Sequence, residues 1–172
     1  MVEDTHYRGW DAVSLKNGDV ELVMPLEVGP RIISARIGEG PNLLCNVDEQ
    51  MGKSGEDAFM IRGGHRLWHA PEDPVRTYER DNVPITLERP EGGGSVIMSG
   101  RKDECAGMSK RVKVENAGER TFRLTHYLKN GNVWPVACAP WSLTVCEYGG
   151  YAVVPLLPKG SHEENLLPNC SL

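Results

Sequence analysis

The stretch Thr121-Phe-Arg-Leu-Thr-His-Tyr-Leu128 decides the fold, because apolar and polar side chains alternate along it with a period of two. Successive side chains of a β-strand point to opposite faces of its sheet, so this alternation predicts a strand with one buried face. The residues on the face expected to be buried are Phe122, Leu124, His126 and Leu128. His126 is therefore either a core histidine or a residue that lines a ligand site.

Short runs with the same period recur through the chain, separated by turns that use many of its 19 glycines and 12 prolines. Asn17-Gly18 predicts a tight hairpin with a primed turn, and residues 116–119 and 130–132 predict two more turns between strands. The predicted strands are residues 19–24, 31–37, 83–88, 95–99, 110–115, 121–128, 133–139, 142–147 and 152–154. This pattern indicates an all-β fold, either a sandwich or a barrel.

Length and charge narrow the class of protein. With 172 residues, the chain is expected to form one domain, residues 1–172. The net charge of -5 argues against nucleic acid as a partner, because phosphate binding needs a basic surface. No apolar run is long enough to cross a bilayer, and the polar start Met1-Val-Glu-Asp-Thr-His6 does not resemble a signal peptide. We expect neither a nucleic-acid nor a membrane partner.

The cysteines favour a reducing compartment. Their number, five, is odd, and no Cys-x-x-Cys pair occurs. These two features argue against a disulfide framework and against a zinc knuckle. We therefore expect reduced thiols in a cytoplasmic protein.

The segment Arg62-Gly-Gly-His-Arg-Leu-Trp-His-Ala-Pro-Glu72 concentrates side chains that bind small polar molecules. Its glycines and Pro71 disfavour a helix, which predicts an irregular or strand-edge segment. Arginine and histidine supply hydrogen-bond donors, and Trp68 supplies an apolar platform, so the segment suits a sugar. Trp68 would serve equally well as a core residue. For Arg66 the alternative to sugar binding is a surface salt bridge.

The same segment is not expected to hold a metal or an organic cofactor. His65 and His69 are four residues apart, which on a helix would place both on one ion together with Glu72. In an extended strand, however, residues four apart are separated by about 13 Å. The glycine run at residues 91–94 lacks the lysine and helix of a phosphate-binding loop.

Several stretches, in order, resemble the galactose mutarotase-like (aldose 1-epimerase-like) superfamily, and more narrowly a bacterial branch of it. They are Gly29-Pro-Arg-Ile-Ile-Ser-Ala-Arg-Ile37, Asn42-Leu-Leu44, Gly63-Gly-His-Arg-Leu-Trp68, Leu124-Thr-His-Tyr-Leu-Lys-Asn130 and Ala139-Pro-Trp-Ser-Leu-Thr144. The resemblance covers roughly residues 20–169. It implies an antiparallel β-sandwich of the galactose mutarotase-like supersandwich type, with a sugar-binding cleft on one face.

The resemblance also implies roles for individual residues. Mutarotation opens a sugar ring by removing a proton from the anomeric hydroxyl while the ring oxygen is protonated. His126 is the expected general acid, and Glu72 is a candidate base that lies outside the family's catalytic position. The residues expected to bind the sugar are His65, Arg66, Trp68, His69 and Trp141.

One departure from the superfamily leaves the activity open. Its members are longer, and Leu166-Leu-Pro-Asn169 resembles a segment inside the family domain, so its catalytic glutamate would lie beyond Leu172. We therefore expect a shortened sandwich that pairs as a homodimer, because half a sandwich leaves exposed edges. Three functions remain: a carbohydrate-binding protein without full catalytic machinery, an aldose 1-epimerase whose base is Glu72 or a partner chain's carboxylate, and a dimeric domain without a ligand.

Overall fold

The structure is a computed structural model that describes residues 1–155. The 166–169 segment and Cys170, which entered the expectations above, lie outside the described residues. In the described part, the strands are β1 (Val2–Tyr7), β2 (Trp10–Asn17), β3 (Val20–Pro25), β4 (Arg31–Ile32), β5 (Ser34–Ile37), β6 (Gly64–Ala70), β7 (Thr86–Glu88), β8 (Ser95–Ser99), β9 (Met108–Gly118), β10 (Thr121–Asn130) and β11 (Ala139–Val145). A short 3-10 helix, η1 (Asp48–Gln50), is the one helical element there.

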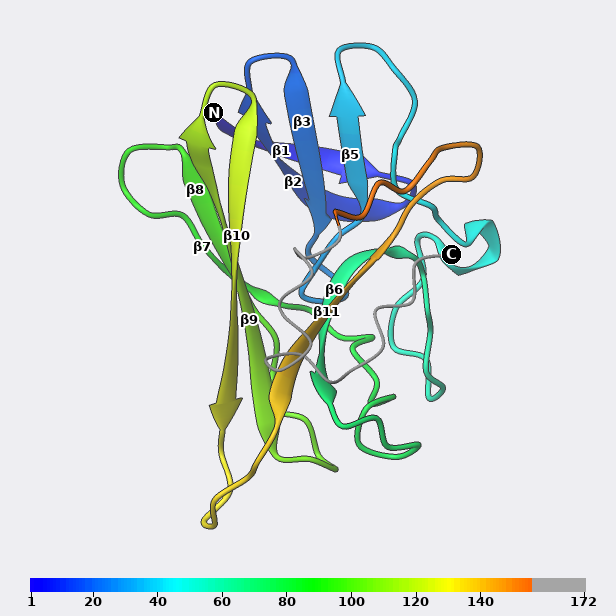
Figure 1. The fold of residues 1–172 in the computed structure, drawn as a ribbon, viewed down its shortest axis with the longest axis vertical. Coiled ribbons are helices and arrows are strands. Elements are labelled where there is room, and N and C mark those ends of the chain that lie inside the picture. Colours follow the sequence, from blue (N-terminus) through cyan, green and yellow to red (C-terminus); the bar gives the residue numbers. More distant parts are fainter. Residues whose placement is uncertain (156–172) are drawn as a thin grey trace, which may run out of the picture.

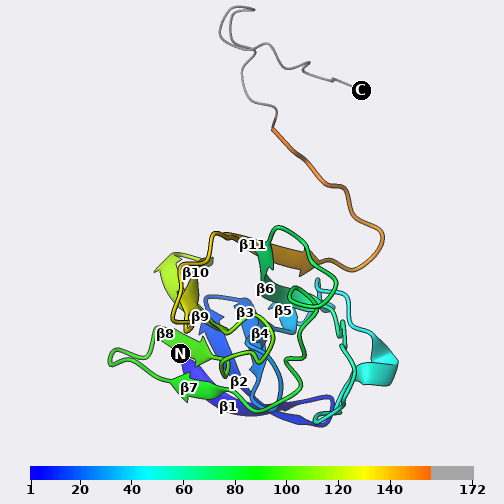
Figure 2. The same ribbon diagram turned by 90° about the horizontal axis from the view of Figure 1, so that it is seen from below.

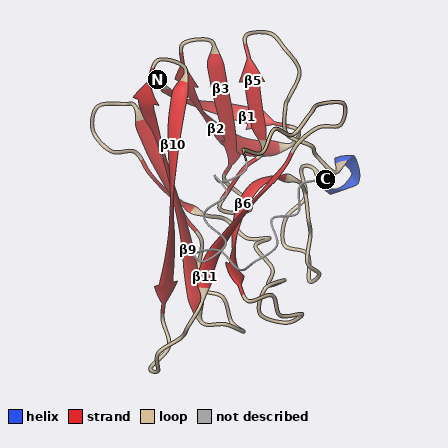
Figure 3. Ribbon diagram, viewed as in Figure 1, coloured by secondary structure: helices blue, strands red, loops and turns tan. Residues whose placement is uncertain are grey.

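The strands form three antiparallel sheets (Figures 1 and 3). Their strand orders are β1-β2-β3-β5, β10-β9-β8-β7 and β11-β6-β4. Viewed from below, β1 and β11 lie on opposite sides of the fold (Figure 2). The predicted all-β antiparallel sandwich is therefore confirmed. The described residues contain no helix long and apolar enough to cross a bilayer.

The hydrophobic core lies where the three sheets meet. Each sheet contributes buried residues to it, for example Leu15 from β2, Val112 from β9 and Leu67 from β6. Phe122, Leu124 and Leu128 of β10 pack against the same core, as the alternation of residues 121–128 predicts. A second cluster around Trp10 lies near the 3-10 helix and includes Met51.

Local patterns predict most of these strands. The 95–99 strand matches β8, the 110–115 and 121–128 strands lie within β9 and β10, and the Asn17-Gly18 hairpin joins β2 to β3. The 31–37 run is divided, because Arg31 and Ile32 pair with β6 whereas residues 34–37 pair with β3. Of residues 83–88 only Thr86–Glu88 is a strand. The polar strand β1 is absent from the predicted set.

Two predicted strands near the end of the described chain are wrong. Residues 133–138 form an exposed loop, and the strand after them, β11, begins at Ala139. Residues 152–154 have no strand neighbour, and the chain leaves the body there (Figure 2). Apolar residues in both segments, such as Val133 and Val153, are about nine-tenths exposed. β-branched residues therefore do not form a strand here, because no neighbouring strand supplies backbone hydrogen-bond partners.

Strand β6 corrects the prediction for residues 62–72. It is neither irregular nor at an edge: it lies between β4 and β11 and is almost wholly buried. Gly63 and Gly64 precede and begin it with positive φ angles of 89° and 74°. A Cβ atom at Gly64 would lie 2.2 Å from the Ile32 carbonyl oxygen, so glycine permits the close approach of β4.

Candidate functional site

The predicted sugar-binding residues of β6 are divided between the two faces of its sheet. His65, Leu67 and His69 alternate with Arg66 and Trp68 along the strand. The register with β11 places Thr144 opposite His65 and Trp141 opposite Trp68. Residues directly opposite in antiparallel strands share a face. The sequence-predicted residues therefore form two groups rather than one pocket.

The first group is the histidine pair, His65 and His126. Their Nε2 atoms lie 2.8 Å apart, and the two side chains come from strands in different sheets, β6 and β10. Nδ1 of His65 lies 2.8 Å from Oγ1 of Thr144. A hydrogen bond between two imidazole nitrogens needs one N–H and one lone pair, so a single proton lies between the two Nε2 atoms. The hydroxyl of Thr144 then donates or accepts to suit the tautomer of His65.

Burial keeps both imidazoles neutral at pH 7. Burial and, to a smaller extent, repulsion between positive charges on His65 and His126 together lower the pKa of His65 to about 4. Burial also lowers the pKa of His126, although this ring is less deeply enclosed. A neutral pair of imidazoles exchanges hydrogen bonds with hydroxyl groups in both directions. It is less suited to supplying a proton from an imidazolium ion.

The second group lies on the opposite face of β6, and its side chains are buried against other parts of the protein. The Arg66 guanidinium lies 5.0 Å from the ring centroids of both Phe59 and Trp68 and bonds to Asp81 at 3.2 Å. Trp68 also packs edge-on against Tyr78 and Trp141, with ring centroids 5.0 and 5.4 Å away. Only 4% of Arg66 and 7% of Trp68 is exposed. Arg66 thus makes a buried salt bridge and Trp68 fills a core, which leaves neither free to bind a sugar in this arrangement.

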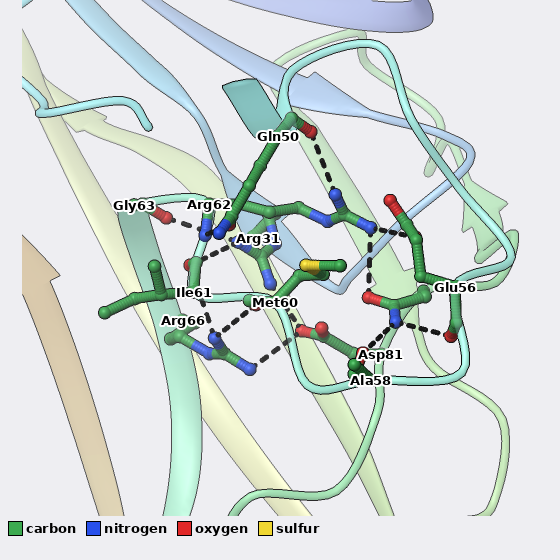
Figure 4. A network of polar contacts seen from close by, with 11 residues as sticks. Arg31, Gln50, Glu56, Ala58, Met60, Ile61, Arg62, Gly63, Arg66 and Asp81 are labelled. Atoms are coloured by element: carbon green, nitrogen blue, oxygen red, sulfur yellow. Dashed lines mark hydrogen bonds and ion pairs between the residues drawn. The ribbon is translucent and has the colours of Figure 1, made fainter. Parts of the chain in front are cut away.

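Arg66 belongs to a buried arginine cluster that the sequence pattern did not predict (Figure 4). The cluster consists of Arg31, Arg62 and Arg66, with Asp81 and Glu56 as the carboxylates. Arg31 and Arg62 are fully buried. Arg31 donates to Asp81 at 2.7 Å, and Arg62 donates to Glu56 at 2.6 Å. The sequence contained one signal: Arg31 directly precedes the apolar β-branched pair Ile32 and Ile33.

The arginines of the cluster also hydrogen-bond to the backbone of the segment before β6, which includes Gln50, Ile61 and Gly63. Arg62 donates to the carbonyl oxygen of Gln50, and Arg31 donates to those of Ile61 and Gly63. Figure 4 shows these side chains meeting next to the loop that carries Glu56 and Ala58. Burial lowers the pKa of Arg66 to about 10, so the group still carries its charge at pH 7. The cluster holds the fold around β6, and its arginines are buried.

The other candidate residues lie away from the histidine pair. Glu72 follows β6 in an exposed position, where its carboxylate accepts a hydrogen bond from the Tyr78 hydroxyl. His69 lies four residues beyond His65, a distance of about 13 Å along an extended strand. Within residues 1–155, no group of three or more His, Cys, Asp or Glu side chains is placed to bind a metal ion. The structure therefore brings His65 to His126 and adds Thr144, which was not among the predicted site residues.

Comparison with known proteins assigns no family. No protein-family model matches the chain, and neither a curated protein nor a solved structure matches it.

Proposed function

We propose that this protein binds a carbohydrate, that it is related to the aldose 1-epimerases, and that the histidine pair is the centre of its binding site. The observation that carries the proposal is the 2.8 Å contact between Nε2 of His65 and Nε2 of His126. These residues are 61 positions apart, and both stand in stretches that resemble the superfamily's site segments. Thr144 extends the pair with a hydroxyl on an exposed strand position.

The chemistry of the pair suits a polyol. A sugar hydroxyl is both a donor and an acceptor, and a neutral imidazole offers one of each. The shared Nε2 proton means that a hydroxyl inserted between the rings would accept from one histidine and donate to the other. Such a ligand would replace the 2.8 Å contact with two hydrogen bonds and would separate the rings.

Binding without turnover is the form of the proposal that the geometry favours. Mutarotation needs an acid and a base on opposite sides of the ring atoms. The predicted base, Glu72, has its carboxylate engaged by Tyr78, whereas His126 bonds to His65. Polarimetry on freshly dissolved α-glucose and α-galactose tests the epimerase alternative, in which Glu72 or a partner chain's carboxylate supplies the base. A rate above the buffer blank that His126→Ala abolishes would favour that alternative.

A homodimer remains part of the proposal. Within the described residues, β10 pairs only with β9 and β11 only with β6, so each presents a free edge. Unpaired strand edges tend to bond to another chain. Sedimentation equilibrium tests this arrangement: a concentration-dependent dimer is expected, and a monomer at all concentrations would contradict it.

Calorimetric titration with a panel of hexoses, pentoses and sugar acids tests the binding proposal. At least one sugar is expected to bind, and His65→Ala and His126→Ala should each weaken the binding of that sugar about tenfold, since each removes a hydrogen bond to the ligand. His6→Ala is the matched control, because His6 is a surface histidine with an 83% exposed side chain. Equal affinity in all four proteins would place the sugar elsewhere.

A further inference from the structure

Strand β11 ends the third sheet and has one free side. It bonds to β6 along its other side, and within the described residues no strand bonds to the free one. Five of its seven residues are exposed. Figure 2 shows β11 at the rim of the fold, on the side away from β1. We call the side of β11 that faces away from β6 the β11 edge.

The backbone groups of the even-numbered residues of β11 point to this edge. The carbonyl oxygen of Val145 accepts a 2.9 Å hydrogen bond from the N–H of Cys45, and Cys45 accepts one of 3.0 Å from Gly64 of β6. Val145 therefore directs its backbone toward β6. Because successive residues of a strand direct these groups to alternate sides, those of Ser142 and Thr144 point away from β6. A row of unpaired N–H and C=O groups is a template for another strand.

The other sheet edges carry features that oppose such pairing. β4 has two residues and β7 has three. The longer edge strands carry charges: Glu3 and Asp4 on β1, Arg36 on β5, and Arg123 and Lys129 on β10. Short strands and charged side chains are the usual means by which sheets avoid edge pairing. By contrast, residues 133–146, which include β11, contain no charged side chain.

A second copy of the chain is the occupant that the β11 edge fits. Two-fold symmetric pairing brings the same strand of both copies together, and like charges directly opposite each other are destabilising. A strand without charges avoids this repulsion. Exposed apolar residues on both sides of β11, such as Val136 and Tyr148, lie where the second copy can cover them.

We propose that two copies of the chain pair antiparallel through their β11 edges, with Ser142 opposite Ser142 of the second copy. Ser142 is the middle residue of β11, so this register pairs the whole strand. It joins the two β11-β6-β4 sheets into one. The inference rests on the homodimer of the proposed function and names the strand that forms it. It does not depend on sugar binding.

Two native cysteines report on this register. Cys138 and Cys146 are free, exposed and placed four residues before and after Ser142, so Cys138 lies opposite Cys146 of the second copy. Opposite residues that exchange both backbone hydrogen bonds have Cα atoms about 5.5 Å apart, which is within the range of roughly 4.4–6.8 Å that a disulfide spans. Diamide, which takes one hydrogen atom from each of two thiols, is therefore expected to link the copies through Cys138 and Cys146.

Non-reducing electrophoresis and peptide mass spectrometry detect this link. Cys138→Ser should abolish it, because each of the two symmetric disulfides needs Cys138. Cys105→Ser is the matched control: Cys105 is also free and exposed but lies outside β11, so the link should persist.

Opposite charges at position 142 give a second test that does not involve thiols. Ser142→Glu and Ser142→Lys each place like charges opposite each other and should each raise the Kd of the dimer about fivefold. Mixing the two variants should restore the affinity and yield mainly the mixed dimer, which a folding defect in either variant would not produce. Thr121→Glu, at an exposed position of β10, should leave the Kd unchanged.

The outcomes separate this inference from the proposed function. A dimer in sedimentation equilibrium that forms no link between Cys138 and Cys146 would overturn the β11 pairing and leave the homodimer standing. Links through Cys105 as frequent as those through Cys138 would mark random collisions and would also overturn the pairing. A monomer at all concentrations would overturn both the pairing and the homodimer, while calorimetry tests sugar binding separately.

Discussion

The carboxylate of Asp81 accepts a 2.7 Å hydrogen bond from Arg31, 50 residues away, and the same oxygen accepts one from Arg66. The Arg31 side chain is fully buried, and 14% of the Asp81 side chain is exposed. Three buried arginines thus depend on two carboxylates, of which Asp81 serves two. Through this carboxylate, the loop after β6 is bound to Arg31 of β4 and Arg66 of β6.

Asp81→Asn is expected to destabilise the protein by about 3 kcal/mol, because removing one partner of a buried ion pair leaves the other charge uncompensated. Denaturant unfolding followed by circular dichroism measures the change. Asp57→Asn is the control: Asp57 pairs with Arg80 on the surface, so no measurable change is expected. Equal effects of the two substitutions would contradict the structural role of the cluster.

Acid should weaken the fold in two steps. Burial alone would raise the pKa of Asp81, but Arg31 and Arg66 outweigh it, and the pKa lies below its usual value. The stabilisation from this carboxylate is therefore complete above about pH 4, near the pKa of an unfolded aspartate, and is lost as the pH falls further. Asp81→Asn should flatten the dependence of the unfolding free energy on pH below about pH 4.

Protonation of His65 in the unfolded chain causes the other loss of stability, which occurs at higher pH. Its pKa is about 4 in the folded state, below the value of 6.5 for an unperturbed histidine. The unfolded chain therefore binds the proton first, and stability falls as the pH drops from about 6.5 to 4. The loss amounts to about 3 kcal/mol at most, at about 1.36 kcal/mol per pH unit. His65→Gln should reduce this slope and leave the smaller part that belongs to His126, whose pKa burial also lowers. A slope as steep as that of the unaltered protein would contradict the assignment.

Thr144→Val should change the tautomer balance of the histidine pair. The substitution removes the partner of His65 Nδ1 and leaves the Nε2 contact with His126 in place. The imidazole nitrogen shifts of His65, measured by long-range proton–nitrogen NMR, are expected to move. Thr125→Val on the outer face of β10 is the control, and the same shifts in both variants would argue against the hydrogen bond.

Gly64→Ala should destabilise the protein severely, by about 4 kcal/mol or more, because the new Cβ would lie 2.2 Å from the Ile32 carbonyl oxygen. Gly92→Ala is the matched control. Gly92 also has a positive φ, 96°, but a Cβ there meets no atom within 4 Å. Its substitution should cost about 1 kcal/mol from backbone strain alone. Thermal unfolding compares the two, and similar losses would contradict the close approach of β4 to β6.

The fold was predictable where the decisive contacts are local. Alternation within residues 95–99 and 121–128 suffices to identify β8 and β10, and Asn17-Gly18 suffices for the first hairpin. β6 was not predicted as a central strand, because its glycines and polar residues are not typical of one. It pairs with β4, which lies about 30 residues before it in the chain, and with β11, which lies about 75 residues after it.

The site was predictable only in part, for the same physical reason. The face of His126 follows from alternation, but its contact with His65 depends on how two sheets pack, which no local pattern encodes. The separation of His65 from Arg66 follows directly once β6 is known to be a strand, because neighbouring residues point to opposite faces. Treating residues 62–72 as irregular therefore merged two faces into one expected pocket.

The most direct test of the central claim is a sugar titration followed at the ring nitrogens of His65 and His126 by long-range proton–nitrogen NMR. If the histidine pair binds a carbohydrate, the Nε2 signals of both residues will shift together and saturate with one member of the sugar panel, while those of His6 stay fixed. If every sugar in the panel leaves both Nε2 signals unchanged up to its solubility limit, the histidine pair is not a carbohydrate site.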